Sequence, residues 1–348
     1  MKLPLLLALL LSTTLTLASP IPGDSPLISV EGRYQSLDTE NVTRLGFPGT
    51  TLHLRFTGQK AIFHYEASSE QVLVDIQLND TPYQRHQLTK GTATLELTAP
   101  PTTTAHELRI VLRTEGYQGT LKALSFEAPD GEIIQGPPLP KKKLLFIGDS
   151  ITAGAATDYR KDDPKSGFLP SNGRYSYGYQ LSRILDTQCH LVAFGGKGLV
   201  RDWQGMRSEP TAPNYYEQSL PNDPSTVWDN SQYIPDAVFI CLGQNDFNKG
   251  IPDEEDWTAA YIAFIRKISR DAPNAPFFLL ESPMYGPDNI KRLVARRYLN
   301  RVKDALPNIQ IHLIQTAYLP GPTNAHPDKD GQKQIAEHLA PLVRETLQ

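Results

Sequence analysis

The stretch LLFIGDSITAG, residues 144–154, decides how the rest of the chain is interpreted. Its four leading apolar residues, Leu144–Ile147, are typical of a strand that is buried on both faces of a parallel sheet. Gly148, Asp149 and Ser150 follow where such a strand would turn into a helix. A serine on that turn presents its hydroxyl above the sheet, and its N–H lies at a helix start that favours an oxyanion. The alternative is that Asp149 or Ser150 merely caps the helix.

Similar apolar runs recur downstream of this stretch, and amphipathic segments separate them. Trp257, Tyr261, Phe264 and Ile265, for example, recur at helical spacing. Such alternation of strand and helix predicts a three-layer α/β/α domain with a five-stranded parallel sheet over residues 144–348. Sites in such sheets form beyond the carboxyl ends of the strands. The further runs are HLVAFGG (190–196), AVFICLG (237–243), PFFLLES (276–282) and IQIHLIQ (309–315).

The segment upstream, residues 19–136, has a different pattern. Leu52, Leu54 and Phe56 alternate with His53 and Arg55, and comparable runs follow with Gly, Pro, Asn and Thr between them. This alternation predicts half-buried antiparallel strands and an all-β sandwich domain without helices. The proline-rich residues 137–143 then form a linker, because proline stiffens a segment and cannot complete strand pairing.

The first 18 residues have the pattern of a signal peptide. Lys2 precedes a short apolar run, Leu3–Leu11, and the small residues Thr16 and Ala18 suit a cleavage site. The run is well short of the ~20 residues that a membrane-spanning helix requires. The alternative, a buried N-terminal helix, is less favoured. We therefore expect a secreted or periplasmic protein with no membrane span.

Composition and charge exclude several classes of function. The chain has 348 residues, 39% hydrophobic and 21% charged, with a formal net charge of −4, so nothing suggests a nucleic-acid partner. No cluster has metal-ligand spacing, and no P-loop or dinucleotide fingerprint occurs, so no metal or cofactor is expected. Cys189 and Cys241 lie beside strand-like runs and are interpreted as buried free thiols rather than a bridge. No pattern indicates an oligomeric state.

Three more clusters at predicted strand ends carry groups suited to catalysis. The glycine pair Gly195 and Gly196 lets a backbone N–H approach a ligand closely, although a simple turn is the alternative. Asn245 places an amide donor where negative charge would develop, unless it is only a turn residue. His326, followed by Pro327 on a loop, is a candidate general base.

Taken together, the order and spacing of these clusters resemble the SGNH, or GDSL-like, hydrolase superfamily over residues ~143–348. The resemblance implies that Ser150 is the nucleophile and His326 the base. It also implies an oxyanion hole formed by the N–H of Ser150, by Gly196 and by the amide of Asn245. Gly195 is the alternative to Gly196, because the sequence leaves the register open by one residue.

Finer detail resembles the acetylesterases of carbohydrate esterase family 2. The segments GGKGLVRDW (195–203), VWD (227–229) and LGQNDF (242–247) carry this similarity. It implies a jelly-roll-like sandwich before the hydrolase domain, and removal of O-acetyl groups from xylan- or glucomannan-type polysaccharide. Trp228 and Trp203 are the candidates for stacking on a sugar ring, with core packing as the alternative for each.

The sequence departs from the superfamily pattern at one position. An aspartate that orients the histidine often stands three residues before it, but this chain has Thr323 there. Asp328 and Asp330 follow His326 and lead into the last helix, where carboxylates stabilise a helix N-terminus. We therefore expect a Ser–His dyad, with His326 oriented by a backbone carbonyl or by Asn324.

Two other functions compete with carbohydrate deacetylation. A lipid esterase or thioesterase on the same frame would need an apolar acyl channel. The polar stretch 155–174, which is expected to overhang the site, favours a sugar instead. A non-catalytic glycan-binding protein would not need Ser150, Asn245 and His326 together. The pattern of residues 19–136 leaves open whether the sandwich itself binds glycan.

Overall fold

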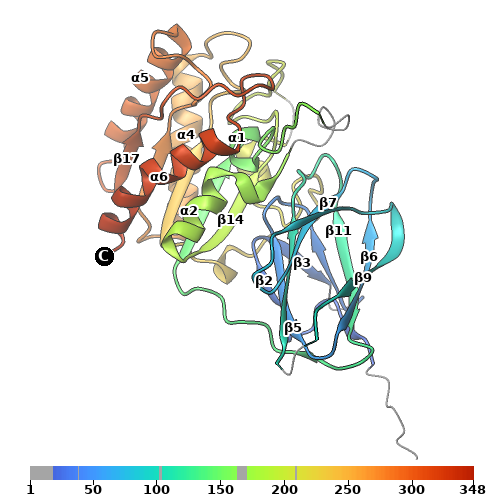
Figure 1. Ribbon diagram of the computed structural model, residues 1–348. Coiled ribbons are helices and arrows are strands. Elements are labelled where there is room, and N and C mark those ends of the chain that lie inside the picture. Colours follow the sequence, from blue (N-terminus) through green and yellow to red (C-terminus); the bar gives the residue numbers. More distant parts are fainter. Residues whose placement is uncertain (1–18, 38, 102–103, 163–170, 208–209) are drawn as a thin grey trace, which may run out of the picture.

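The computed structural model describes residues 19–37, 39–101, 104–162, 171–207 and 210–348. The expected signal peptide, residues 1–18, lies outside the described residues. The described chain forms two domains in contact with each other, a β-sandwich followed by an α/β domain (Figure 1).

The β-sandwich consists of two antiparallel sheets and contains no helix among the described residues, which confirms the sequence prediction. One sheet has the order β3 (Tyr34–Leu37), β4 (Val42–Leu45), β11 (Leu121–Glu127), β6 (Lys60–Ala67) and β9 (Gly91–Thr98), with β1 (Ile21–Pro22) paired to β11. The other has the order β12 (Ile133–Ile134), β5 (Thr51–Phe56), β10 (His106–Leu112), β7 (Leu73–Leu78) and β8 (Gln84–Gln87), with β2 (Ser29–Glu31) paired to β5.

Alternation along β5 gives the sandwich its core, and both faces of this strand are buried. Leu52, Leu54 and Phe56 point into the core between the sheets. His53 points the other way, yet it is also buried, and it bonds Glu31 at 3.2 Å. The α/β domain covers this face of the second sheet around Glu31, which pairs with Arg183 of that domain, whereas Arg109 of β10, on the same face as His53, stays partly exposed.

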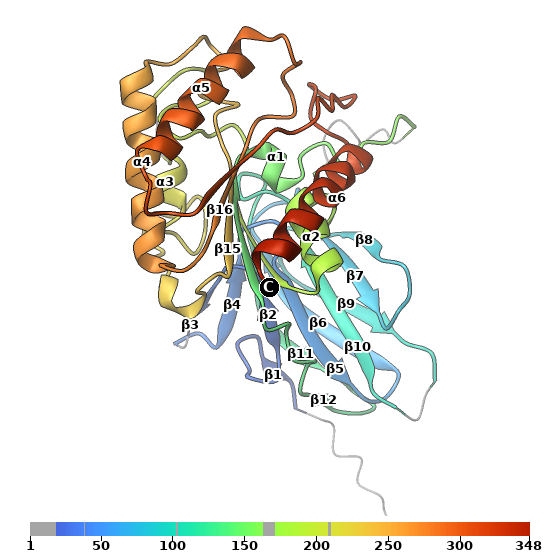
Figure 2. The same ribbon diagram turned by 90° about the vertical axis from the view of Figure 1, so that its left-hand side faces the viewer.

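The α/β domain contains five parallel strands between two layers of helices, as predicted. The sheet order is β14 (Gln188–Ala193), β13 (Lys143–Gly148), β15 (Ala237–Cys241), β16 (Phe277–Leu280) and β17 (Ile311–Ile314). Helices α2 (Tyr177–Leu185) and α6 (Lys329–Thr346) cover one face, and α4 (Glu254–Asp271) and α5 (Ile290–Asp304) cover the other (Figure 2). Short helices α1 (Ser150–Ala153) and α3 (Ala212–Tyr215) complete the set that positions the site.

The α/β domain begins close to the expected boundary. Residues 135–142 form no helix or strand, and β13 starts at Lys143, one residue before the predicted start. The register of the sheet then aligns Gly148 with Ala193 on one side and with Cys241 on the other. The segments that follow these three strands therefore meet at one edge of the sheet, as the motif positions require.

Two buried charged residues of the sandwich bind the α/β domain directly. Arg33 donates to the carbonyls of Tyr216 and Gln218, and its guanidinium lies 5.0 Å from the ring centroid of Trp228. Burial lowers the pKa of Arg33 to about 10, so the side chain stays charged at neutral pH. Glu31 pairs with Arg183 and accepts the N–H of Cys189 at 2.8 Å. Because Arg33 and Glu31 are buried and their hydrogen bonds are specific, these contacts fix the relative placement of the domains.

Both cysteines are buried free thiols, which confirms the interpretation from sequence. Burial raises the pKa of Cys189 and of Cys241 well above the usual range of a thiol. None of the helices in the described part of the chain has the length and apolar character needed to span a bilayer.

Candidate active site

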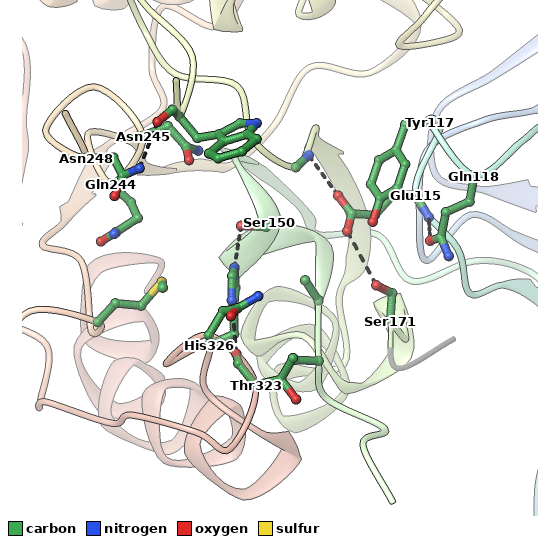
Figure 3. A pocket seen from close by; sticks show the side chains of 17 residues that line it. Glu115, Tyr117, Gln118, Ser150, Ser171, Gln244, Asn245, Asn248, Thr323 and His326 are labelled. Atoms are coloured by element: carbon green, nitrogen blue, oxygen red, sulfur yellow. Dashed lines mark hydrogen bonds between the residues drawn. The ribbon is translucent and has the colours of Figure 1, made fainter. Parts of the chain in front are cut away.

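A cavity of about 730 Å³ lies at the carboxyl edge of the parallel sheet. Ser150, Gly196, Asn245 and His326 all line it, although they come from four separate segments of the chain. Its volume is in the range of small-molecule sites, ~300–1,000 Å³. Figure 3 shows Ser150 and His326 facing each other in this cavity, with side chains of the β-sandwich on the opposite wall.

Ser150 begins α1, a single helical turn directly after β13. Its Oγ lies 2.8 Å from Nε2 of His326, which is a hydrogen-bond distance. Asp149 caps the turn, because its Oδ1 accepts the N–H of Ile151 at 3.0 Å. Each of the two roles considered for this motif therefore falls to a different residue. Asp149 caps the helix, and the Ser150 hydroxyl faces the cavity.

His326 is held by a tight turn over residues 323–326. Asn324 and Ala325 have φ values of 49° and 58°, a left-handed conformation that is uncommon for residues with side chains. The carbonyl of Thr323 accepts the N–H of His326 at 2.9 Å and lies 3.3 Å from its Nδ1. This contact favours the tautomer with hydrogen on Nδ1, so that Nε2 is free to accept from Ser150.

The acids that follow His326 are engaged elsewhere. Asp328 is the N-cap of α6, and its carboxylate accepts the N–H groups of Asp330 and Gly331. Asp330 lies in the first turn of the same helix. Burial lowers the pKa of His326 below its ordinary value, and hydrogen bonds to the backbone of Thr323 and Asn324 offset part of this effect. A histidine in this environment is neutral near pH 7.

The glycine pair forms the turn that follows β14. Gly196 has φ +78°, and a Cβ there would lie 2.9 Å from Cδ1 of Trp203, so conformation and space both require glycine. The N–H of Gly195 donates to Oε2 of Glu115 at 2.7 Å. The N–H of Gly196 makes no hydrogen bond with another residue that the structure describes.

Asn245 lines the cavity, but its amide is already bonded. Nδ2 donates to the carbonyl of Lys197 at 2.8 Å and to Oδ2 of Asp149 at 3.1 Å. Burial is the main cause that raises the pKa of Asp149 to about 7, and the nearby charge of Asp246 adds to it. The amide is thus fixed in place, and it reaches an oxyanion only by sharing a hydrogen that now points to Asp149 or Lys197.

The two tryptophans lie in different environments. Trp203 lines the cavity and is 50% exposed, and its N–H and C=O are held by Gly196 and Asn248. Trp228 is only 5% exposed and packs between Arg33 and His190 at the domain interface. The structure corrects the assignment of Trp228 to sugar binding, because an enclosed indole has no free face for a ligand.

One wall of the cavity was not predictable from the sequence. Glu115, Tyr117 and Gln118 of the β-sandwich line it, from the loop after β10. Burial raises the pKa of Glu115 to about 7, and the charge of Asp149 adds to this increase. The sequence around Glu115 resembles an ordinary turn after a strand, so nothing in it indicates that a second domain closes over this loop.

The expected overhang contributes to the cavity at its two ends. Ala155, Ala156 and Ser171 line the cavity, whereas residues 163–170 lie outside the described part of the chain. No group of three or more His, Cys, Asp or Glu side chains arranged to hold a metal ion occurs among the described residues.

Comparisons with known proteins match both halves of the chain. Residues 146–346 match the model of the GDSL-like lipase/acylhydrolase family, and residues 30–138 match that of the carbohydrate esterase 2 N-terminal domain. An acetylxylan esterase / glucomannan deacetylase of Cellvibrio japonicus is 30% identical over 342 residues, covering 97% of this chain and 93% of the relative.

Solved structures show the same two-domain arrangement. A family two carbohydrate esterase from Cellvibrio japonicus superposes with a TM-score of 0.89 at 28% identity, over 94% of this chain and 98% of that one. A family two carbohydrate esterase from Clostridium thermocellum, solved in complex with cellohexaose, gives a TM-score of 0.84 at 25% identity, over 92% and 99% of the two chains.

Proposed function

The chain belongs to the GDSL-like lipase/acylhydrolase family and to carbohydrate esterase family 2, and on that premise we propose that it removes O-acetyl groups from xylan- or glucomannan-type carbohydrate. It is a carboxylic ester hydrolase. The observation that carries the finer proposal is the 2.8 Å contact between Ser150 Oγ and His326 Nε2 within a cavity that has a polar wall.

The reaction begins with attack of Ser150 Oγ on the acetyl carbonyl carbon, while Nε2 of His326 takes the hydroxyl proton. The resulting oxyanion accepts hydrogen bonds from the N–H of Ser150 and Gly196 and from the Asn245 amide. Collapse of this intermediate breaks the bond to the sugar oxygen, which receives the proton from His326. Water, deprotonated by the same nitrogen, then hydrolyses the acetyl-serine and releases acetate.

In this mechanism His326 works without a carboxylate partner. The carbonyl of Thr323 holds Nδ1, which fixes the ring and its tautomer. A carbonyl stabilises the imidazolium less than an anion would, because it carries only a partial charge. The lowered pKa of His326 is in line with this arrangement, since it keeps the base neutral at ordinary pH.

The shape and chemistry of the cavity favour a sugar as the leaving group. The half-exposed indole of Trp203 at the cavity wall offers a face to a pyranose ring. Gln244, Asn248 and Gln118 supply amide groups for sugar hydroxyls. The C. thermocellum relative was solved in complex with cellohexaose, which supports a glucan-type chain as ligand.

A series of aryl esters of increasing acyl length tests the proposal against the lipid esterase alternative. We expect the acetyl ester to be hydrolysed fastest, and we expect acetate release from acetylated xylan or glucomannan. Faster turnover of the octanoyl ester would favour a lipid or thioester substrate. Binding of the polysaccharide without release of acetate would favour a non-catalytic glycan-binding protein.

The pattern of residues 1–18 also supports export of the protein to the periplasm or the medium.

A further inference from the structure

A loop of the β-sandwich brings a carboxyl group into the cavity of the other domain. Glu115 lies in a turn after β10, where its N–H donates to Oε1 of Gln118 at 3.0 Å and its carbonyl accepts the N–H of Gln118 at 2.9 Å. Asn222 of the α/β domain donates to the carbonyl of Gly116 at 2.6 Å, so the turn is also fixed across the domain boundary. The Glu115 side chain is 1% exposed and lines the cavity (Figure 3).

The carboxyl group of Glu115 binds the backbone of the glycine turn. Oε2 accepts the N–H of Gly195 at 2.7 Å, and Ser171 Oγ donates to Oε1 at 3.4 Å. A Cβ at Gly195 would lie 2.3 Å from Oε2, so this contact leaves room for glycine alone. Because the N–H of Gly195 is directed to Glu115, it is not directed to a substrate, whereas the next N–H, that of Gly196, remains available.

The far side of the same turn is held by the α/β domain itself. Asp246 accepts the N–H groups of Leu199, Val200 and Arg201 at 2.8 to 3.2 Å. The segment between Gly195 and Leu199 is therefore anchored at both ends, once by each domain. The free N–H of Gly196 lies between these anchors, and its direction depends on both.

We propose that Glu115 is a positioning residue of the esterase: it accepts the N–H of Gly195 across the domain boundary and thereby makes Gly196 the glycine that faces the oxyanion. The inference rests on the proposed function, because it assigns a role at that site. It also selects between the two registers that the sequence left open. Glu115 touches neither the Ser150 hydroxyl nor the His326 ring among the hydrogen bonds of the structure, so it acts through the glycine turn.

The ionisation of Glu115 agrees with this role. Burial raises its pKa to about 7, so a large share of the carboxyl groups is neutral at the pH of most assays. A neutral acid still accepts the N–H of Gly195, and it places no full negative charge beside a developing oxyanion. A glutamine at this position keeps the same acceptor and is neutral at every pH, which makes it the conservative variant.

The test compares Glu115→Gln with Glu115→Met, which has a similar volume and no carbonyl acceptor. We expect the Met variant to lose about 10- to 100-fold in kcat on an acetyl aryl ester with little change in KM, as small misplacements of catalytic groups do. We expect the Gln variant to stay within about threefold of the native enzyme, on the basis that its acceptor is retained. Glu132→Ala, an exposed change in the same domain, is the matched control and should alter neither constant.

A loss in the Met variant that appears only in KM would overturn the proposal, and so would a kcat within about threefold of native. Gly195→Ala supplies a second measurement. It should lower kcat in the native background and add little in Glu115→Ala, where room for a Cβ exists, so the two effects should be non-additive. Fully additive effects would contradict the contact.

Ser150→Ala separates failure of this inference from failure of the proposed function. If Ser150→Ala is inactive while Glu115→Met keeps its kcat, only the role of Glu115 is refuted. If Ser150→Ala retains esterase activity, the proposed mechanism itself is wrong, and the positioning role is refuted with it.

Discussion

The two walls of the cavity differ in how they are built. Ser150, Asn245 and Gly196 follow adjacent parallel strands, so the topology of one sheet brings them together. Glu115 and its neighbours reach the same cavity only because a separate domain is fixed against that sheet by contacts such as Arg33 with Tyr216. The first wall follows from strand order, whereas the second follows from domain docking. We expect the first wall to hold the reacting groups and the second to adjust the position of these groups.

The largest loss of activity is expected from a change in the first wall, which consists of residues at the ends of the parallel strands. Ser150→Ala should lower kcat by ~10⁴-fold or more, because it removes the nucleophile and leaves only binding and the oxyanion hole. Initial rates on an acetyl ester, with thermal unfolding as the control for folding, measure this loss. Retention of more than a few per cent of native kcat in a folded variant would mean that the nucleophile lies elsewhere.

Asn245→Ala should produce the next largest effect, a loss of ~10²–10³ in kcat, the usual cost of one oxyanion donor. Its amide also bonds Asp149 and Lys197, so we expect some loss of thermal stability as well. If kcat were unchanged and only stability fell, the amide of Asn245 would merely support the turn. The first wall would then contain one reacting group fewer than proposed.

The pH dependence of kcat/KM tests the environment of His326. The base must be neutral, so activity should rise with pH through its pKa, by about tenfold per pH unit on the acid side. Because burial lowers this pKa, the midpoint should lie below 6.5. Glu115→Gln should not shift this midpoint, because the acid side of the pH profile reports the ionisation of His326. A midpoint above 7 in the native enzyme would indicate an unseen carboxylate partner.

A comparison of the two tryptophans gives a smaller effect. Trp203→Ala should raise KM for an acetylated oligosaccharide about 3- to 10-fold, the size of one aromatic stacking contact, with little change for a small aryl ester. Trp228→Phe should leave both KM values unchanged and lower the melting temperature, because it loosens the packing of Arg33 at the domain interface. The reverse pattern would restore Trp228 as a ligand contact.

The smallest kinetic effect is expected at Asp328. Asp328→Asn retains the N-cap and should change kcat/KM by less than about tenfold, and Asp330→Asn likewise, because neither acid orients His326. Asp328→Ala should instead cost about 1 kcal/mol of unfolding free energy, as lost caps do. A fall of ~10³ in either Asn variant would identify an orienting acid and contradict the dyad.

Most of the fold was predictable because its patterns are local. Continuous apolar runs such as 144–147 indicate burial on both faces, and the alternation of Leu52, Leu54 and Phe56 indicates a strand with one face in an apolar core. The family resemblance came instead from the polar motifs at the strand ends, and the family models confirm it. The order of these motifs was therefore enough to predict that Ser150, Asn245 and His326 meet in one cavity.

What the sequence could not show depends on how the two domains meet. Trp228 follows an exposed valine and precedes an aspartate, and only its contact with Arg33 reveals that it is interior. His53 sits on the expected solvent face of β5 but is buried beside Glu31, which pairs with Arg183 of the second domain. The contact that distinguishes Gly195 from Gly196 likewise comes from Glu115, about eighty positions away in sequence. Contacts between distant segments of this kind cannot be predicted from a local sequence pattern.

The acceptor that faces Nδ1 of His326 is a peptide carbonyl, and this alters how the site responds to mutation over evolutionary time. A codon change at position 323 replaces the Thr323 side chain and leaves the carbonyl in place, so this contact cannot be deleted by one substitution in the way that an aspartate can. The residues constrained by this contact are instead Asn324 and Ala325, because their left-handed backbone conformation disfavours β-branched residues. We expect substitutions at 323, a residue that lines the cavity, to keep this carbonyl contact, and we expect purifying selection to act on the shape of the turn.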